Sequence, residues 1–349
     1  MEGSGGFGWM TLVWVGVLLV ALLAAHWGAE QFSSPLKKLR KQWGFSVAAG
    51  GAFVGLAAAS PEIGINTSSA LRGSADIGLG VTLGSNILAI PLMVTAAYLA
   101  TRKADIPDHQ GHERHRREHL LAVDPSAVTV QALPYLAIVA LFAILTLPAP
   151  WRGLQSVDGW IMLGAYAVYL AQALIRGREK GEKVEWQTKE VLLATGGVAA
   201  LAVGTYFAVR ATENIATAFG LSKIVAGLFI TTPVAALPEV FATWNVTRSG
   251  QVTSGVTSVM GDHAVTLTIA LLPLALVGMP VSNLLLFSVN VAFVALMPIL
   301  YAAFIHWSGR GEHGFRRWHV FAFIGTYALY MLLIIFWVQP FGGGQGGGQ

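Results

Sequence analysis

Long apolar stretches, separated by short polar segments, run through the whole sequence. Most of them reach about 20 residues, the length that an α-helix needs to cross the hydrocarbon core of a bilayer. The pattern predicts an all-α integral membrane protein, and the first stretch is long enough to span the membrane rather than act as a cleavable signal peptide. We place ten transmembrane helices at 8–28, 44–70, 77–100, 129–148, 158–175, 190–209, 221–246, 253–277, 281–305 and 317–338.

Lysine and arginine residues gather in alternate loops. The loops that follow the odd-numbered spans hold 18 of the 22 lysines and arginines, and the remaining loops hold only Arg72, Arg152, Arg210 and Lys223. Short loops rich in these residues stay on the cytoplasmic side. We therefore expect the basic loops to face the cytoplasm and both termini to lie outside, in a prokaryotic cytoplasmic membrane.

Composition agrees with the membrane prediction. Hydrophobic residues make up 54% of the chain and charged residues 11%, and the mean hydropathy is +0.61, too apolar for a soluble domain of this length. The net charge of +4 follows the loop pattern, so we expect the lipid bilayer and inorganic cations as partners and no nucleic acid. The absence of cysteine excludes a disulfide framework and a thiolate metal site.

Two apolar segments carry the same short motif. Residues 58–62 read Ala-Ala-Ser-Pro-Glu, and residues 235–239 read Ala-Ala-Leu-Pro-Glu. A carboxylate at the centre of the bilayer costs at least ~2.5 kcal/mol, so Glu62 and Glu239 indicate a function. A proline removes one backbone N–H and breaks the helix. We predict a cation site at the two glutamates, with helix breaks at Pro61 and Pro238 that free the carbonyls of Ala57 and Val234.

The position of the two motifs predicts an inverted repeat. Each glutamate falls in the second span of a five-span half, and an odd number of spans turns the second half over relative to the first. The chain should therefore form two inverted five-helix repeats with broken helices at the midplane. We divide it into a first-repeat core at 1–128, spans 4 and 5 at 129–189, a second-repeat core at 190–280, spans 9 and 10 at 281–338, and a disordered glycine- and glutamine-rich tail at 339–349.

Each Pro-Glu motif is followed by a glycine-rich turn and a polar phrase. The first phrase is Gly84-Ser85-Asn86, and the second is Gly261-Asp262-His263. With these motifs the chain resembles the cation/calcium antiporter superfamily, which includes the sodium/calcium exchangers. The resemblance implies cation exchange by alternating access at a midplane site, without a cofactor, with spans 1 and 6 moving against the rest.

The chain departs from the family at its cation ligands. The hydroxyl residues that precede each family glutamate by three and four positions are alanines here. The asparagine or aspartate that ends each family repeat is replaced by Ala89 in the first repeat and by Thr266 in the second. Side-chain oxygens are therefore scarce, while Ca²⁺ takes six to eight oxygen ligands. Backbone carbonyls beside the prolines remain available. The four alanines are Ala58, Ala59, Ala235 and Ala236.

The second repeat instead gains two titratable residues. Asp262 and His263 stand where the family usually has Ser-Asn. Titratable groups in place of hydroxyls favour proton coupling over sodium coupling, because carboxylates that lie close together take up protons when a metal leaves. His263 is either part of this coupling or a packing histidine bonded to a backbone carbonyl or to Asp262.

Four further polar residues in the spans have two interpretations each. Asn66 and Thr243 lie four residues after the two glutamates, on the same helical face, and Ser85 and Asn86 match the family phrase. They are either ligands and partners of ligands or hydrogen-bonding groups between helices.

The loop after the third span carries a second candidate site. His109, His112, His115 and His119 recur at helical spacing. His112, His115 and His119 would share one helical face, as in a regulatory metal site or a pH sensor. A solvated amphipathic segment that lies on anionic lipid explains the same residues.

The sequence thus predicts an antiporter that exchanges a divalent cation, Ca²⁺, for H⁺ or Na⁺. A cation channel with Glu62 and Glu239 as its selectivity pair is an alternative, although paired helix breaks favour alternating access. A second alternative is an ion sensor that has lost transport. We do not expect an enzyme, because the spans contain no metalloprotease motif or serine elbow.

Overall fold

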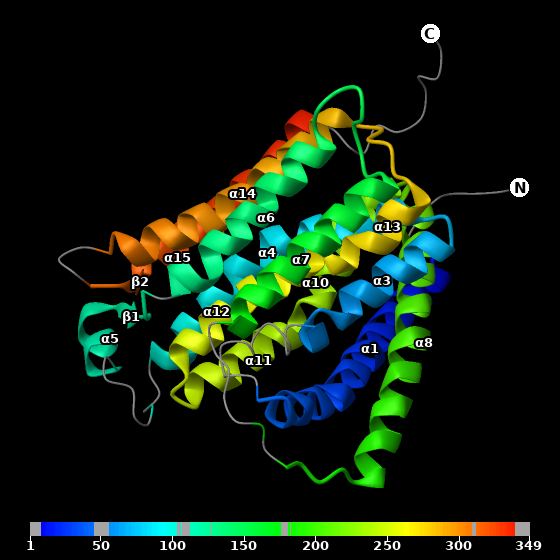
Figure 1. Cartoon of the computed structure of the whole chain (residues 1–349). Helices are drawn as coiled ribbons and strands as arrows, with labels where there is room; N and C mark the ends of the chain where they lie inside the picture. Colours follow the sequence, from blue (N-terminus) through cyan, green and yellow to red (C-terminus); the bar gives the residue numbers. More distant parts are fainter. Residues whose placement is uncertain are drawn as a thin grey trace, which may run out of the picture.

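The computed structural model describes residues 8–44, 56–102, 106, 112–125, 127–175, 181, 183–308 and 312–338, and these are almost entirely helical (Figure 1). The helices are α1 (Trp9–Gln42), α3 (Ser60–Leu71), α4 (Ala75–Arg102), α5 (His112–Glu118), η1 (Val128–Ala132), α6 (Leu133–Thr146), α7 (Ser156–Ile175), α8 (Thr188–Phe219), α9 (Lys223–Ala226), η2 (Gly227–Thr231), α10 (Thr232–Ala235), α11 (Leu237–Arg248), α12 (Val252–Thr266), η3 (Ile269–Leu271), α13 (Leu272–Val277), α14 (Leu284–His306), α15 (Arg317–Leu332) and η4 (Leu333–Val338).

The ten predicted spans coincide with helical segments of the described chain. Eight segments are long and apolar enough to cross a bilayer. Of the other two predictions, the span at 158–175 forms α7, whose apolar stretch is shorter, and the span at 44–70 is described from residue 56 onward and ends in α3. The all-α membrane class is confirmed, and the predicted tail at 339–349 lies outside the described residues.

Two helices are longer than their predicted spans. α1 continues to Gln42, and α8 continues to Phe219, where Gly220 ends it with a φ of +63°. Charged side chains near the helix ends find partners, as Lys38 does with Glu190 at 2.6 Å. A hydropathy window ends where charge begins, but a helix continues wherever its charged residues are paired or hydrated.

Loops that are predicted to share a side of the membrane contact one another. On one side, β1 (Leu120–Ala122) pairs with β2 (Gly314–Arg316) in a two-stranded antiparallel sheet that the sequence did not predict. On the other side, Leu154 pairs with Met279, and Arg72 Nη2 lies 2.5 Å from Glu213 Oε2. These contacts agree with the predicted alternation of loops; which side faces the cytoplasm stays a prediction.

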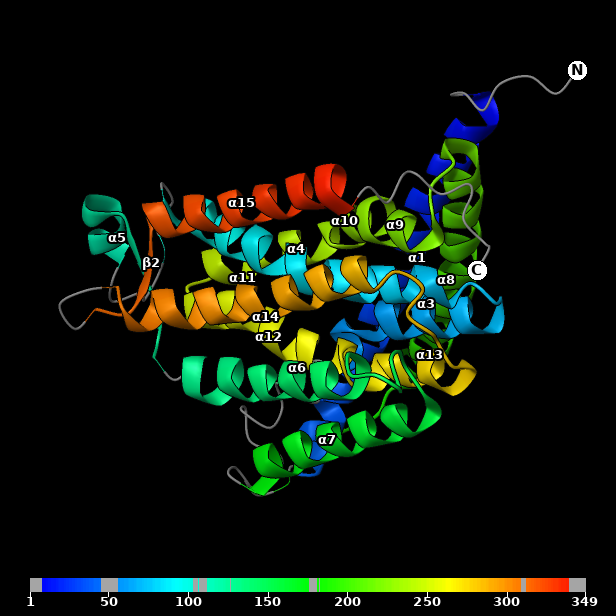
Figure 2. The ribbon, with the colours of Figure 1, turned by 90° about the horizontal axis from the view of Figure 1, so that it is seen from above.

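Helix α4 forms the centre of the bundle. Of its most apolar stretch, 94% is buried, against 22% for α8 and for the segment formed by α15 and η4. The helices packed around α4 include α11, α12 and α14, and α4, α12 and α14 all contribute to the largest apolar cluster (Figure 2). The outer helices leave their apolar faces exposed, as helices in contact with lipid do.

Helices α1 and α8 pack along each other on one flank of the bundle (Figures 1 and 2). At their crossing, an added Cβ at Gly197 would lie 2.6 Å from the carbonyl oxygen of Gly28, and one at Gly28 would lie 2.4 Å from the carbonyl oxygen of Gly197. Small residues allow such close backbone contact between membrane helices. The two glycines therefore set the distance between α1 and α8.

This crossing predicts opposite effects for two neighbouring substitutions. Gly197→Ala is expected to destabilise the protein by ~1–3 kcal/mol, because the new methyl group overlaps the α1 backbone. At Gly196 nothing lies within 4 Å, so Gly196→Ala should be neutral or stabilising by up to ~1 kcal/mol through helix propensity. Thermal unfolding in detergent measures both, and equal melting temperatures for the two variants would contradict the close crossing.

Candidate cation site

Both Pro-Glu motifs lie where a helix restarts. α3 begins one residue before Pro61 and α11 one residue before Pro238. The residues before them interrupt the spans, Ala59 with φ −79° and ψ 2° and Ala236 with φ −73° and ψ −15°. A proline in the first helical turn removes an N–H that has no partner there in any case. Each span thus has one turn residue two positions before its proline, where the sequence predicts a helix break.

Each break places a glutamate in the first turn of the new helix. Glu62 lies in the first turn of α3, and Glu239 lies in the first turn of α11. The amino-terminal end of a helix carries a partial positive charge, which stabilises a nearby carboxylate. The same proline therefore breaks the span and presents the glutamate at a favourable helix end.

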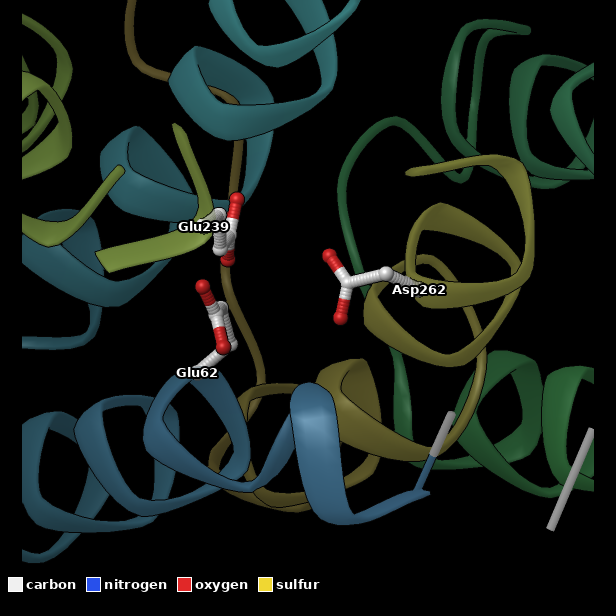
Figure 3. Close-up of side chains that lie close together, drawn as sticks. All are labelled: Glu62, Glu239 and Asp262. Carbon is white, nitrogen blue, oxygen red and sulfur yellow. The ribbon is translucent and has the colours of Figure 1, made fainter. Parts of the chain in front are cut away.

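Three carboxylates from three helices converge on one point. Figure 3 shows Glu62 from α3, Glu239 from α11 and Asp262 from α12 pointing toward one another. One oxygen from each lies within 4.8 Å of the oxygens from the other two. Glu62 is 1% exposed, Asp262 is 6% exposed, and Glu239 is half-buried. Both halves of the chain contribute to this cluster.

The carboxylate cluster holds buried oxygens that have no hydrogen-bond or ion-pair partner among the described residues. Glu62 Oε2 and Asp262 Oδ1 are buried and have no hydrogen-bond partner among the described residues. Among the described residues, no lysine or arginine forms an ion pair with any of the three carboxylates. Buried carboxylates without partners are unfavourable, so a cation or protons must neutralise them.

The polar phrase after the first motif forms a hydrogen-bond network. Asn86 donates through Nδ2 to Thr266 Oγ1 at 2.9 Å and accepts from Tyr135 at 2.6 Å. Its Nδ2 also donates to the carbonyl of Thr82 at 2.7 Å, and the Ser85 hydroxyl donates to the same carbonyl at 3.1 Å. The Asn86 amide is therefore fully engaged between helices α4, α6 and α12.

Asn66 and Thr243 also bond neighbouring helices. Asn66 donates through Nδ2 to Thr82 Oγ1 at 2.9 Å and to the carbonyl of Ala270 at 2.7 Å, and its buried Oδ1 has no partner among the described residues. The Thr243 hydroxyl donates to Met93 Sδ at 3.0 Å. Although the two residues occupy matching positions in the repeats, they have different partners.

The alanines at the family's hydroxyl positions differ in exposure. Ala59, Ala235 and Ala236 are buried, whereas the Ala58 side chain is exposed. The carbonyl of Ala57, which Pro61 deprives of its helical donor, accepts the Ser60 hydroxyl at 2.7 Å. The Ala57 carbonyl, which the sequence predicted to be free for a cation, thus already accepts one hydrogen bond.

His263 is fully buried beside Asp262 in sequence and against Tyr135 in space. The two rings are 5.5 Å apart between their centres. Neither ring nitrogen makes a hydrogen bond of normal geometry among the described residues. The ring nevertheless lies beside the backbone of Ser85, to which it makes a weak hydrogen bond, so both interpretations of His263 stay open.

The histidines of the loop after α4 point to separate partners. His115 is buried against the ring of Tyr98, with 4.9 Å between ring centres, and His119 Nε2 lies 3.4 Å from Arg102 Nη2. His109 and the side chain of His112 lie outside the described residues. The metal interpretation of His112, His115 and His119 stays a prediction.

Sequence reasoning missed the residues that hold the site from outside the two motifs. Tyr135 on α6 hydrogen-bonds the Asn86 amide, and Thr82 on α4 hydrogen-bonds the amides of both Asn86 and Asn66. Thr82 lies four residues before Asn86, a spacing that puts both on one helical face. For Tyr135, a polar aromatic side chain within an apolar span was the available signal.

Comparison with known proteins finds the same architecture. The chain is 24% identical over 242 residues to a putative antiporter, CaxA, of Alkalimonas amylolytica, covering 64% of this chain and 68% of that protein. It is similar in fold to the sodium-calcium exchanger NCX_Mj (TM-score 0.58, 21% identity, 94% of this chain and 99% of that one). It is also similar in fold to the H⁺/Ca²⁺ exchanger CAX (TM-score 0.67, 14% identity, 93% and 81%).

The family model described as "Sodium/calcium exchanger protein" matches residues 13–174 and 189–336. The two matched stretches cover nearly all the described helices, and each contains one of the two Pro-Glu motifs. The chain therefore belongs to the sodium/calcium exchanger family of membrane cation transporters.

Proposed function

We propose that the protein exchanges a divalent cation, Ca²⁺, for protons at a site formed by Glu62, Glu239 and Asp262. The convergence of these three carboxylates within 4.8 Å carries the proposal. Ca²⁺ takes six to eight oxygen ligands in flexible geometry, and carboxylates bind it through one or both oxygens. Three carboxylates, supplemented by carbonyls or water, suit this ion.

Exchange follows from the charge of the empty site. When a divalent cation leaves, three buried carboxylates remain close together with no basic partner among the described residues. Like charges at this distance repel strongly in a medium of low dielectric constant. Other cations must replace the departing ion, so release on one side of the membrane is coupled to uptake of the replacement.

Protons are the preferred replacement because oxygen ligands for sodium are scarce. The four family hydroxyl positions are alanines. Two of the remaining side-chain oxygens nearby already accept hydrogen bonds: Asn86 Oδ1 from Tyr135 and Thr266 Oγ1 from Asn86. Asp262 adds a third carboxylate that can accept a proton.

Sodium coupling is the second candidate. Membership of the sodium/calcium exchanger family and the fold shared with NCX_Mj favour it. In this case backbone carbonyls next to the breaks at Ala59 and Ala236 would replace the missing hydroxyls as ligands.

Alternating access requires one part of the molecule to move past another. We assign the moving part to α1 and α8, which correspond to predicted spans 1 and 6. They pack with each other more extensively than with any other element and cross at Gly28 and Gly197. As a pair they can shift along the outside of the carboxylate cluster while keeping their own contact.

A flux measurement in proteoliposomes tests the coupling. Ca²⁺ uptake is followed under an imposed proton gradient without sodium, and then under a sodium gradient without a proton gradient. We expect uptake driven by the proton gradient alone. Uptake that needs sodium would replace proton coupling with sodium coupling, and a Ca²⁺ current that needs neither gradient would identify a channel. Binding of Ca²⁺ without any flux would identify a sensor.

A further inference from the structure

A shallow groove with charged and aromatic walls lies at the end of the bundle that carries the small β-sheet. Its volume is about 290 Å³. In Figures 1 and 2 this end, marked by α5 and β2, lies away from α3, which supplies Glu62 to the carboxylate cluster. The groove is lined by Glu118, His119, Arg316, Arg317, Trp318 and Phe321.

The groove forms where two distant segments of the chain meet. Pairing of Leu120 with Arg316 sets the end of α5 beside the start of α15. Arg316 serves this junction: its Nε donates to the carbonyl of Ser308 at 2.8 Å, and its Nη2 donates to Glu312 at 3.1 Å. Arg316 is therefore engaged in holding the loop.

Arg317 differs from its neighbour. No carboxylate pairs with it in the described part of the chain, and its guanidinium carbon lies 5.6 Å from the centre of the Phe321 ring. Trp318 and Phe321 are 58% and 59% exposed at the start of a membrane span. Among the described residues, Arg317 thus has the two exposed aromatic side chains beside it and no carboxylate partner.

We propose that this groove binds the headgroup of an anionic phospholipid. The Arg317 guanidinium would bind the phosphate through two parallel hydrogen bonds, a geometry in which arginine is favoured over lysine. Trp318 and Phe321 would lie along the glycerol and the upper acyl chains, where aromatic residues of membrane proteins concentrate. Glu118 also lines the groove and disfavours a second anionic group, so the groove suits one phosphate.

The predicted topology supports an anionic lipid as the ligand. The groove lies at the basic end of the bundle, which the lysine and arginine distribution assigns to the cytoplasmic side. Anionic lipids of the cytoplasmic leaflet attract basic residues near its surface. The proposal concerns the surface of the bundle and is independent of which ions the carboxylate cluster exchanges.

Thermal unfolding of the full-length protein in an uncharged detergent tests the proposal. Dihexanoyl-phosphatidylglycerol, dihexanoyl-phosphatidylcholine and inorganic phosphate are titrated separately. We expect phosphatidylglycerol to raise the melting temperature at lower concentration than phosphatidylcholine, and phosphate alone to have no effect. In Arg317→Gln the half-saturating concentration of phosphatidylglycerol should rise about fivefold, the effect of one basic residue near the membrane surface.

Two further variants separate the site from general effects. Arg152→Gln removes an exposed arginine from a loop on the opposite side and should bind phosphatidylglycerol as the unmodified protein does. Arg317→Lys keeps the charge but loses the two parallel hydrogen bonds, so its half-saturating concentration should lie between those of the unmodified protein and Arg317→Gln. It supplies a result even if Arg317→Gln fails to fold. Equal stabilisation by both lipids, an unchanged Arg317→Gln variant, or equal loss in Arg152→Gln would overturn the lipid site. Stabilisation by phosphate alone would replace it with a site for a free anion.

Discussion

Replacement of Glu239 or Glu62 by glutamine is expected to abolish Ca²⁺ exchange. Each substitution keeps the size of the side chain but removes one negative charge from a cluster whose oxygens lie within 4.8 Å of one another. Loss of one partner from a buried charge interaction costs ~3–5 kcal/mol, which corresponds to at least a hundredfold weaker cation binding. Gradient-driven Ca²⁺ uptake into proteoliposomes, with Ca²⁺ binding measured in parallel, records the loss.

A matched acid outside the cluster controls for charge alone. Glu30 lies exposed on α1, so Glu30→Gln removes the same charge without touching the site. This variant should transport as the unmodified protein does. Variants of Glu62 and Glu239 that fold normally and still exchange Ca²⁺ at full rate would show that the site lies elsewhere.

The sequence predicted the helices and their breaks because both are local properties. Apolar stretches of about 20 residues located the spans, and Pro61 and Pro238 located the breaks at Ala59 and Ala236. The helix ends were less well predicted. α1 and α8 continue into charged segments whose partners, such as Lys38 and Glu190, lie far apart in the chain.

The hydrogen-bond partners inside the site could not be predicted from the sequence, because they depend on how distant helices pack together. The match between repeats put Asn66 and Thr243 in equivalent places, yet one bonds a threonine and a backbone carbonyl and the other a methionine sulfur. The Tyr135 hydroxyl on α6 donates a hydrogen bond to Asn86 on α4. The rotation of each helix about its axis decides such pairs, and three-dimensional packing sets that rotation.

The sequence predicted the place of Asp262 but not the role of its neighbour His263. Its position in the second polar phrase predicted a third acid near the two glutamates, and the structure brings its carboxylate to them. The same reasoning left His263 with two interpretations. The structure buries the ring beside the backbone of Ser85 and the ring of Tyr135, and both interpretations stay predictions.

Replacement of Asp262 by asparagine is expected to uncouple Ca²⁺ binding from part of its proton exchange. Asp262→Asn removes one carboxylate from the cluster, as the glutamate variants do, so Ca²⁺ binding should weaken. The measurement is therefore made at Ca²⁺ concentrations that saturate the site. The third carboxylate no longer takes up a proton when Ca²⁺ leaves. Fewer protons should be released for each Ca²⁺ bound, and Ca²⁺ binding should weaken less steeply as the pH falls.

Proton release on Ca²⁺ addition, read with a pH indicator in weakly buffered detergent solution, measures this coupling directly. His263→Gln is the comparison, because it removes the neighbouring titratable group and leaves all three carboxylates in place. If Asp262→Asn releases as many protons per Ca²⁺ as the unmodified protein and His263→Gln releases fewer, the coupling group is the histidine. If proton release falls only in Asp262→Asn, the acid that replaces the family's serine is what makes protons the exchanged ion.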